Sequence, residues 1–273
     1  KPDWWLVAKS TFIPTIKPDK EFISMLVAIL GTTISPYLFF WQVTMEAQDV
    51  KDAKKMIMVH RRAVQKDRID TSQLKKREKR FISLLISKMQ LDVNVGMLLS
   101  NMVMFFIILA TGSALYGHGI TKIDTVEQAA KALEPVAGKS SYFLFAIGVI
   151  GTGFLAIPVL SGSLSYIVSE TFGWRGDLDK KFFQAKSFYM VIIVSIIIGL
   201  LINYIGISPI QALFYTAVLY GITSPILIGI VLHIANNKKI MGDHKNSRLS
   251  NVLGWITFLL MLASALYLLY LQF

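Results

Sequence analysis

An apolar segment at residues 22–43 is long enough to cross a lipid bilayer, but a polar stretch and a proline interrupt its middle. The interruption reads Gly31-Thr-Thr-Ile-Ser-Pro36. Pro36 has no backbone N–H and clashes with the carbonyl one turn before it, while Gly31 allows non-helical backbone. Backbone groups released in this way are costly in hydrocarbon unless protein, water or a ligand satisfies them. We therefore predict a helix in two halves with a gap that lines a cavity. The alternative is an ordinary proline kink held by neighbouring helices.

The rest of the chain contains further uncharged apolar runs that reach about 20 residues, the length at which a helix spans a bilayer. Hydrophobic residues make up 54% of the chain. The expected fold class is therefore an all-α integral membrane protein with six transmembrane spans, of which the first is broken. The other spans are expected at residues 91–116, 142–169, 187–204, 210–234 and 252–271. The span at 210–234 contains a second break signal, Gly221-Ile-Thr-Ser-Pro225.

The basic residues gather in alternate loops. The formal net charge is +11, and Lys and Arg outnumber Asp and Glu in residues 44–90, 170–186 and 236–248. Cytoplasmic loops of membrane proteins carry such an excess, so the charge indicates topology and not a nucleic-acid partner. The expected division is an external loop at 1–21, a broken transmembrane helix at 22–43, a basic cytoplasmic segment at 44–90, and five further transmembrane helices with short loops at 91–273.

Two loops allow a more detailed interpretation. Met56, Val59 and Ala63 form an apolar stripe beside basic residues, which suits a helix resting on anionic membrane lipid. A solvated basic helix that continues the broken span fits these residues equally well. In the predicted external loop at 117–140, Thr125 is followed by an acid and by helix-forming residues, so we predict a short helix that Thr125 caps.

The residue types that usually carry catalysis are missing or scattered. The chain has no cysteine, and its histidines lack the spacing of a zinc site or a catalytic cluster. They are His60, His118, His233 and His244. A glycine-rich phosphate loop and a nucleophile elbow are also missing. We expect neither an enzyme nor a bound cofactor.

No Asp or Glu lies in the middle of a predicted span, although a divalent cation that crosses a membrane normally needs a carboxylate. The chain can therefore offer only part of a cation site. The broken span supplies carbonyls near Thr32 and the hydroxyls of Ser35 and Thr33, and the span at 210–234 supplies the hydroxyls of Thr223 and Ser224.

The interrupted sequence from Gly31 to Gln42 resembles the sixth helix of the NRAMP family of divalent metal transporters. Residues 232–242 resemble the end of the tenth helix in the bacterial NRAMP-related branch, and residues 169–174 also fit. The family has a LeuT-like fold of two inverted five-helix repeats. The resemblance implies that this chain holds helices six to eleven, the second repeat plus one extra helix, of a longer protein. Helices one to five, with the family's metal-binding aspartate and asparagine, would be a missing N-terminal half.

The resemblance also assigns roles to individual residues. The carbonyl of Thr32 takes the place of the helix-six carbonyl ligand, and Ser35 stands where typical members have a methionine. Tyr37 and Gln42 occupy the positions of two histidines linked to proton movement. Thr223 falls near a helix-ten glutamine that joins the metal ligands. Thr33 would line the pathway, and Gly31, Pro36 and Pro225 would break the helices.

The differences from typical family members at Ser35, Tyr37 and Gln42 alter the expected chemistry. A thioether favours soft or borderline transition metals, so serine in its place weakens discrimination against Mg²⁺, and we keep Mn²⁺/Fe²⁺ and Mg²⁺ open. Losing both histidines removes groups that titrate near neutral pH.

The function that we expect is secondary-active transport of a divalent metal ion by alternating access, in a multi-pass protein of the bacterial inner membrane. The alternatives are an amino-acid or organic-cation carrier of the same fold and a non-transporting membrane subunit.

Overall fold

The computed structural model describes residues 3–34, 42–48, 50, 71–116, 122–174, 176, 178–242 and 245–272, and every regular element in these ranges is helical. The α-helices are α1 (Trp4–Phe12), α2 (Lys20–Ile34), α4 (Thr71–Ala114), α5 (Val126–Ala130), α6 (Glu134–Ala137), α7 (Ser141–Phe172), α8 (Lys186–Ile202), α9 (Pro209–Asn236), α10 (Lys238–Met241) and α11 (Arg248–Tyr270). Short 3₁₀ turns lie at Lys131–Leu133, Gly138–Ser140, Phe182–Gln184 and Asn203–Ile205. Residues 42–48 are also helical.

Four of the described helices are long and apolar enough to cross a membrane. They lie at Ile86–Ala114, Gly138–Phe172, Pro209–Asn236 and Arg248–Tyr270. Helix α8 is apolar but shorter, and α2 ends at Ile34, as a half-length helix before the predicted break should. The all-helical membrane class is confirmed.

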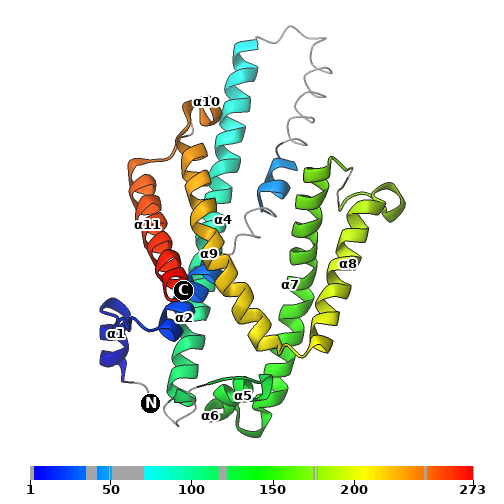
Figure 1. The fold of residues 1–273 in the computed structure, drawn as a ribbon. Coiled ribbons are helices and arrows are strands. Elements are labelled where there is room, and N and C mark those ends of the chain that lie inside the picture. Colours follow the sequence, from blue (N-terminus) through cyan, green and yellow to red (C-terminus); the bar gives the residue numbers. More distant parts are fainter. Residues whose placement is uncertain are drawn as a thin grey trace.

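Helices α2, α9 and α11 pack against one another around a small apolar core (Figure 1). Ile23 and Val27 of α2 and Leu268 of α11 are buried there, and Val218 and Ile222 of α9 pack on them. The closest approach involves two glycines. A Cβ atom on Gly31 would overlap the backbone of Ala217 and Gly221, and one on Gly221 would overlap the backbone and side chain of Val27. The backbones of α2 and α9 are therefore in direct contact.

Helices α7 and α8 form a second packed pair, on the other side of the molecule in Figure 1. Phe188 of α8 is fully buried against Tyr166 of α7, with ring centroids 4.9 Å apart, and the Ser165 hydroxyl donates to the Phe188 carbonyl. Gly176 sits so close that a Cβ there would lie 2.6 Å from the Phe188 ring. Tyr189 Oη donates to the Lys180 carbonyl at 2.8 Å, so the connection is folded back onto its helices.

The capped helix predicted in the 117–140 loop is confirmed as α5. Thr125 is its N-cap, and the hydroxyl of Thr125 accepts a hydrogen bond from the Gln128 amide at 3.3 Å. The pKa of the Glu127 carboxyl lies below its ordinary value, because the Glu127 backbone amide and the Thr125 side chain donate hydrogen bonds to the carboxylate.

Two of the predicted break positions are wrong. Gly31 lies inside α2, which continues to Ile34, because its missing side chain is needed for the approach to α9 and not for a turn. Pro225 lies inside α9, which is continuous from Pro209 to Asn236. A proline removes one helical hydrogen bond, which bends a packed helix without ending it, and α9 bends along its length in Figure 1.

The helix predicted at 91–116 is also longer than expected. Helix α4 begins at Thr71 and runs as one 44-residue helix to Ala114, so residues 71–90 of the basic segment extend the membrane span. Leu, Lys, Arg, Glu and Gln dominate that extension and all favour helix. Because adding a residue to an existing helix is far easier than starting a new one, the apolar span can continue into a polar sequence.

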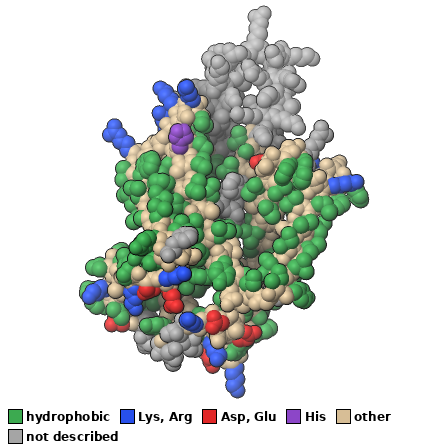
Figure 2. All heavy atoms as spheres, in the orientation of Figure 1, with side chains coloured by type: hydrophobic (Ala, Val, Ile, Leu, Met, Phe, Trp, Pro, Cys, Tyr) green, Lys and Arg blue, Asp and Glu red, His purple; other side chains and the backbone are tan. Residues whose placement is uncertain are grey.

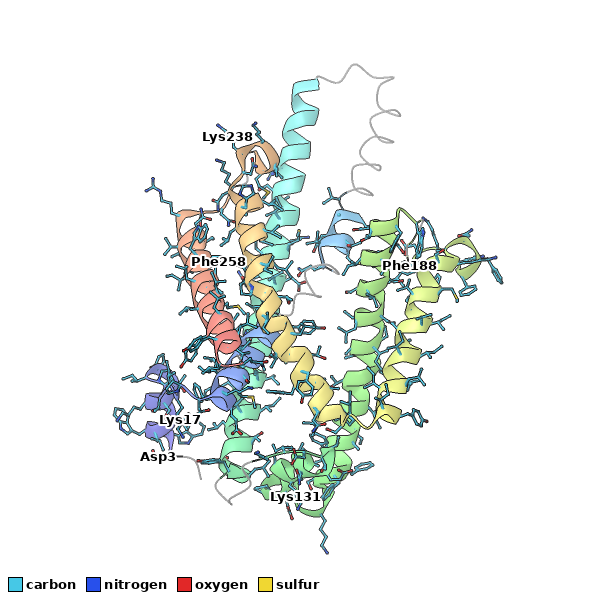
Figure 3. The ribbon with its side chains drawn as sticks, viewed as in Figure 1. Asp3, Lys17, Lys131, Phe188, Lys238 and Phe258 are labelled. Atoms are coloured by element: carbon cyan, nitrogen blue, oxygen red, sulfur yellow. The ribbon has the colours of Figure 1, made fainter. Side chains whose placement is uncertain are left out.

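The two ends of the molecule differ in charge. Hydrophobic side chains cover the middle in Figure 2, and most of the acidic side chains in that view lie at the lower end. Lys17 and Lys131 lie at that end, whereas Lys238 lies at the upper end together with Phe188 at the α7–α8 connection (Figure 3). The basic α7–α8 and α9–α11 connections therefore share one end, as the alternating topology requires.

The glycine contact yields a prediction for stability. Gly31→Ala should destabilise the folded protein by about 1–3 kcal/mol or more, the usual cost of overpacking, because the methyl group would meet backbone that cannot move aside. Gly199→Ala in α8 is the control, since nothing lies within 4 Å of its added Cβ. The measurement is the thermal midpoint in detergent, followed by size-exclusion chromatography. Equal midpoints for the two variants would contradict the contact.

Candidate functional site

The crossing of α2 and α9 is the candidate site, because two of the polar residues singled out from sequence, Thr32 and Ser224, lie within one helical turn of it. Gly31 contacts Ala217 and Gly221, and Gly221 contacts Val27, so the two helices cross at these glycines. Thr32 follows the contact directly on α2, and Ser224 follows it on α9.

The two threonines at the end of α2 use their hydroxyl protons locally. Thr32 Oγ1 and Thr33 Oγ1 donate to the Ile29 carbonyl at 2.9 and 2.8 Å. Thr33 Oγ1 also lies 3.9 Å from Met104 Sδ, which joins α2 to α4. Residues 31–34 are helical, although Gly31 would also allow non-helical backbone. A hydroxyl oxygen whose proton is engaged can still accept hydrogen bonds or bind a cation.

Helix α9 carries a proline that removes a donor near the contact. In an α-helix the carbonyl of residue i accepts from the amide of residue i+4, so Pro225 has no N–H to donate to the Gly221 carbonyl. Gly221 is itself in contact with Gly31, the neighbour of Thr32. The carbonyl that loses a proline donor thus lies at the crossing itself.

The hydroxyl residues on α9 are not equivalent. Each residue turns a helix by about 100°, so Thr223 lies about 200° around α9 from Gly221, while Ser224 lies about 60° from it. Ser224 is completely buried and its hydroxyl donates to the Tyr220 carbonyl at 2.6 Å. Thr223 is partly buried and donates to Leu219 and Tyr220 at 3.0 and 3.2 Å. Ser224 is therefore closer to the α2 face than Thr223, the residue named from sequence.

Several predicted residues have no described position. Ser35, Pro36 and Tyr37 lie outside the described residues, so their roles stay predictions. Gln42 is described at the start of the helical stretch 42–48 and is partly buried. Within the described part of the chain, no group of three or more His, Cys, Asp or Glu side chains gathers to hold a metal.

The residue that sequence reasoning missed is Gly221. It was treated as part of a break, yet it is the point at which α9 meets α2. A signal was available, because each of the two spans contains a glycine a few residues before a proline. Pairing the two glycines across 190 residues of sequence would have required the tertiary structure.

Comparison with known sequences gives this geometry a family context. The family described as Nramp, natural resistance-associated macrophage protein-like, matches residues 1–271. The chain belongs to the Nramp family. With its long apolar helices, this Nramp chain is an integral membrane protein.

Curated Nramp relatives match at low identity. Divalent metal cation transporter MntH of Caldanaerobacter subterraneus subsp. tengcongensis is 25% identical over 254 residues, which are 93% of this chain and 52% of that protein. The protein of the same name from Clostridium acetobutylicum is 24% identical over 275 residues, or 100% of this chain and 55% of that protein. The one from Yersinia enterocolitica is 22% identical over 98% of this chain and 56% of its own length. The chain thus spans about half the length of these relatives.

Because the hydroxyls of α9 differ in burial, their removal should have different effects on stability. Ser224→Val should destabilise the protein by about 1–3 kcal/mol, because a larger apolar group replaces a fully buried hydroxyl at the crossing. Thr216→Val is the matched control, since its hydroxyl makes the same type of bond, to Ala212 at 2.7 Å, but is exposed. The measurement is the difference in thermal midpoint. A larger effect at Thr216 would show that Ser224 is not at a packed crossing.

Proposed function

We propose that the protein carrying this chain transports divalent metal cations across the membrane by alternating access. The single observation that carries the proposal is the α2–α9 crossing, where the two helices touch through Gly31 and Gly221 and Pro225 removes the donor for the Gly221 carbonyl. Family membership and the printed names of the relatives support metal cations as the substrate class. On this proposal the chain forms the second repeat and one extra helix of a LeuT-like fold in a bacterial inner membrane.

The proposed substrate site takes oxygen ligands from α2 and from the segment that follows it. The Thr32 carbonyl and the Ser35 hydroxyl would bind the ion from one side, with Ser224 or Thr223 approaching from α9. A carbonyl oxygen has two lone pairs, and oxygen donors suit hard ions such as Mg²⁺ and Mn²⁺. Serine where typical members of the family have methionine therefore broadens selectivity towards Mg²⁺, with Mn²⁺ and Fe²⁺ still accepted.

The selectivity argument predicts the effect of restoring a sulfur ligand. Ser35→Met should raise the preference for Mn²⁺ or Cd²⁺ over Mg²⁺ by about tenfold, the equivalent of roughly 1.4 kcal/mol, because a thioether favours softer ions. The measurement is competition between these ions for uptake into proteoliposomes. Ser10→Met, on the exposed face of α1, is the control and should leave the ratio unchanged. A ratio that Ser35→Met does not alter would exclude Ser35 as a ligand.

The residues at the two histidine positions predict weak coupling to protons. Neither Tyr37 nor Gln42 titrates near neutral pH, so metal uptake should bring little acidification of the vesicle lumen. The measurement is uptake of Mn²⁺ and Mg²⁺ into proteoliposomes of the full-length protein, with and without a pH gradient, while the internal pH is recorded. Strong metal-driven acidification would contradict this prediction but not metal transport itself.

Introducing a histidine at residue 37 tests whether this position lies in the ion path. Tyr37→His introduces a side chain that, unlike tyrosine, gains a positive charge as the pH is lowered and then repels a divalent ion. Uptake by this variant should therefore fall as the pH is lowered from about 7.5 to about 5.5, relative to the parent protein. Tyr204→His is the control, because Tyr204 is exposed in the turn between α8 and α9. Identical pH profiles for the two variants would place Tyr37 outside the ion path.

A further inference from the structure

The ends of α9 and α11 form an open pocket that the proposed transport site does not use. It has a volume of about 440 Å³ and is lined by Gly229, Leu232, His233, Asn236, Asn237, Asn251 and Trp255. It lies at the end of the molecule where Figure 3 places Lys238, away from the α2–α9 crossing. Figure 2 shows the histidine and several Lys or Arg side chains at this end.

The mouth of the pocket is polar and fixed. Asn236 Nδ2 donates to Asn251 Oδ1 at 2.8 Å, and Asn251 Nδ2 donates back to Asn236 Oδ1 at 2.6 Å. Asn236 also donates to the Leu232 carbonyl at 2.9 Å. This reciprocal amide pair links the cytoplasmic-type ends of α9 and α11. The Asn246 amide donates to the Ala235 carbonyl at 3.2 Å and so holds the connection against α9.

The deeper wall of the pocket is apolar. Leu232 lies so close to Gly254 that a Cβ there would be 2.6 Å from Leu232 Cδ2, which brings α9 and α11 together below the mouth. Trp255 forms the other wall, half exposed and held edge-to-face against Phe258 with ring centroids 5.4 Å apart. About one turn from the amide side chains at the loop, the lining consists of Leu232 and His233 on α9 and Trp255 on α11.

The charge around this mouth is strongly positive. Lys238, Lys239, Lys245 and Arg248 lie in the connection or at its ends, against one acid, Asp243. The four cations are exposed. Lys238 directly follows the lining residue Asn237, and Arg248 stands one helical turn before Asn251. A ligand in the pocket would meet cations, His233 and amides at one end and hydrocarbon at the other.

We propose that this pocket binds an anionic glycerophospholipid of the membrane leaflet, with the phosphate at His233, Lys238 and Arg248 and the upper acyl chain along Leu232 and Trp255. Basic pockets between transmembrane helices on the cytoplasmic side attract anionic headgroups, and tryptophan favours the interface. A free phosphate would satisfy the cations but would leave the apolar wall unused. The polar-to-apolar change matches an amphipathic ligand.

The test measures lipid contact at Trp255 directly. The full-length protein is reconstituted into mixed vesicles of phosphatidylcholine and phosphatidylglycerol. In one series the phosphatidylglycerol carries bromine on its acyl chains, and in the other series the phosphatidylcholine does. The signal of Trp255 is the difference in fluorescence between the parent protein and Trp255→Phe. We expect brominated phosphatidylglycerol to quench Trp255 at a lower mole fraction than brominated phosphatidylcholine does.

Variants that remove basic residues test whether the preference for phosphatidylglycerol arises at this pocket. The double variant Lys238→Gln/Arg248→Gln should weaken the apparent affinity for phosphatidylglycerol by roughly 25-fold, about fivefold for each charge removed. Lys180→Gln/Lys181→Gln is the matched control, because it removes two charges from the other basic connection at the same end. That control should retain the preference. Size-exclusion profiles establish that both double variants are folded.

Four outcomes would overturn the proposal. Equal quenching by the two lipids would show no headgroup selection, and an equal loss in the Lys180/Lys181 variant would show a general surface effect. Relief of quenching by millimolar inorganic phosphate would assign the site to a soluble anion. Quenching by neither lipid would show that another protein segment covers the pocket. Metal uptake is measured separately, so failure of the lipid proposal is distinct from failure of the transport proposal.

Discussion

The direct backbone contact between α2 and α9 is the constraint on which the rest of this structure depends. A side chain on Gly31 or Gly221 would separate the helices, because each added Cβ would meet backbone atoms of the other helix. The contact brings the end of α2 against the middle of α9, and α11 then closes the same core with Leu268. Thr32 on α2 and Ser224 on α9 therefore each lie within one helical turn of the contact.

The membrane explains why glycine is used there. Between helices in lipid there is no hydrophobic driving force of the kind that folds soluble proteins, so association depends on close packing and on hydrogen bonds. Two glycines let backbones approach, and the dispersion contacts of the neighbouring Val27 and Ala217 gain from that approach. Glycine also permits close contact at Gly254, against Leu232, and at Gly176, against Phe188. Each packed group of helices in the described part thus relies on a missing side chain at a contact.

The sequence was sufficient for the local and one-dimensional features of the fold. Apolar runs of sufficient length predicted the helices, the loop charges predicted which connections share an end, and Thr125 predicted the cap of α5. It was insufficient wherever two distant segments determine the outcome. A glycine such as Gly31 is compatible with a turn and with a close helix contact, and the surrounding sequence does not distinguish the two. The position of Gly221 in the folded structure shows that it makes a helix contact. Pro225 is tolerated inside α9 because packing compensates the lost hydrogen bond, and packing is not encoded in the local sequence.

The chemistry of the crossing has a consequence for how a divalent ion would be held. The ligands that the described part of the chain offers near Gly31 and Gly221 are carbonyl and hydroxyl oxygens, which are neutral dipoles. Removing a divalent ion from water is costly, and neutral oxygens replace its hydration without offsetting its charge. The offsetting charge would have to come from a carboxylate elsewhere in the full-length protein, since this chain spans about half the length of its relatives. An ion would then be stable only when that carboxylate and the crossing oxygens approach it together.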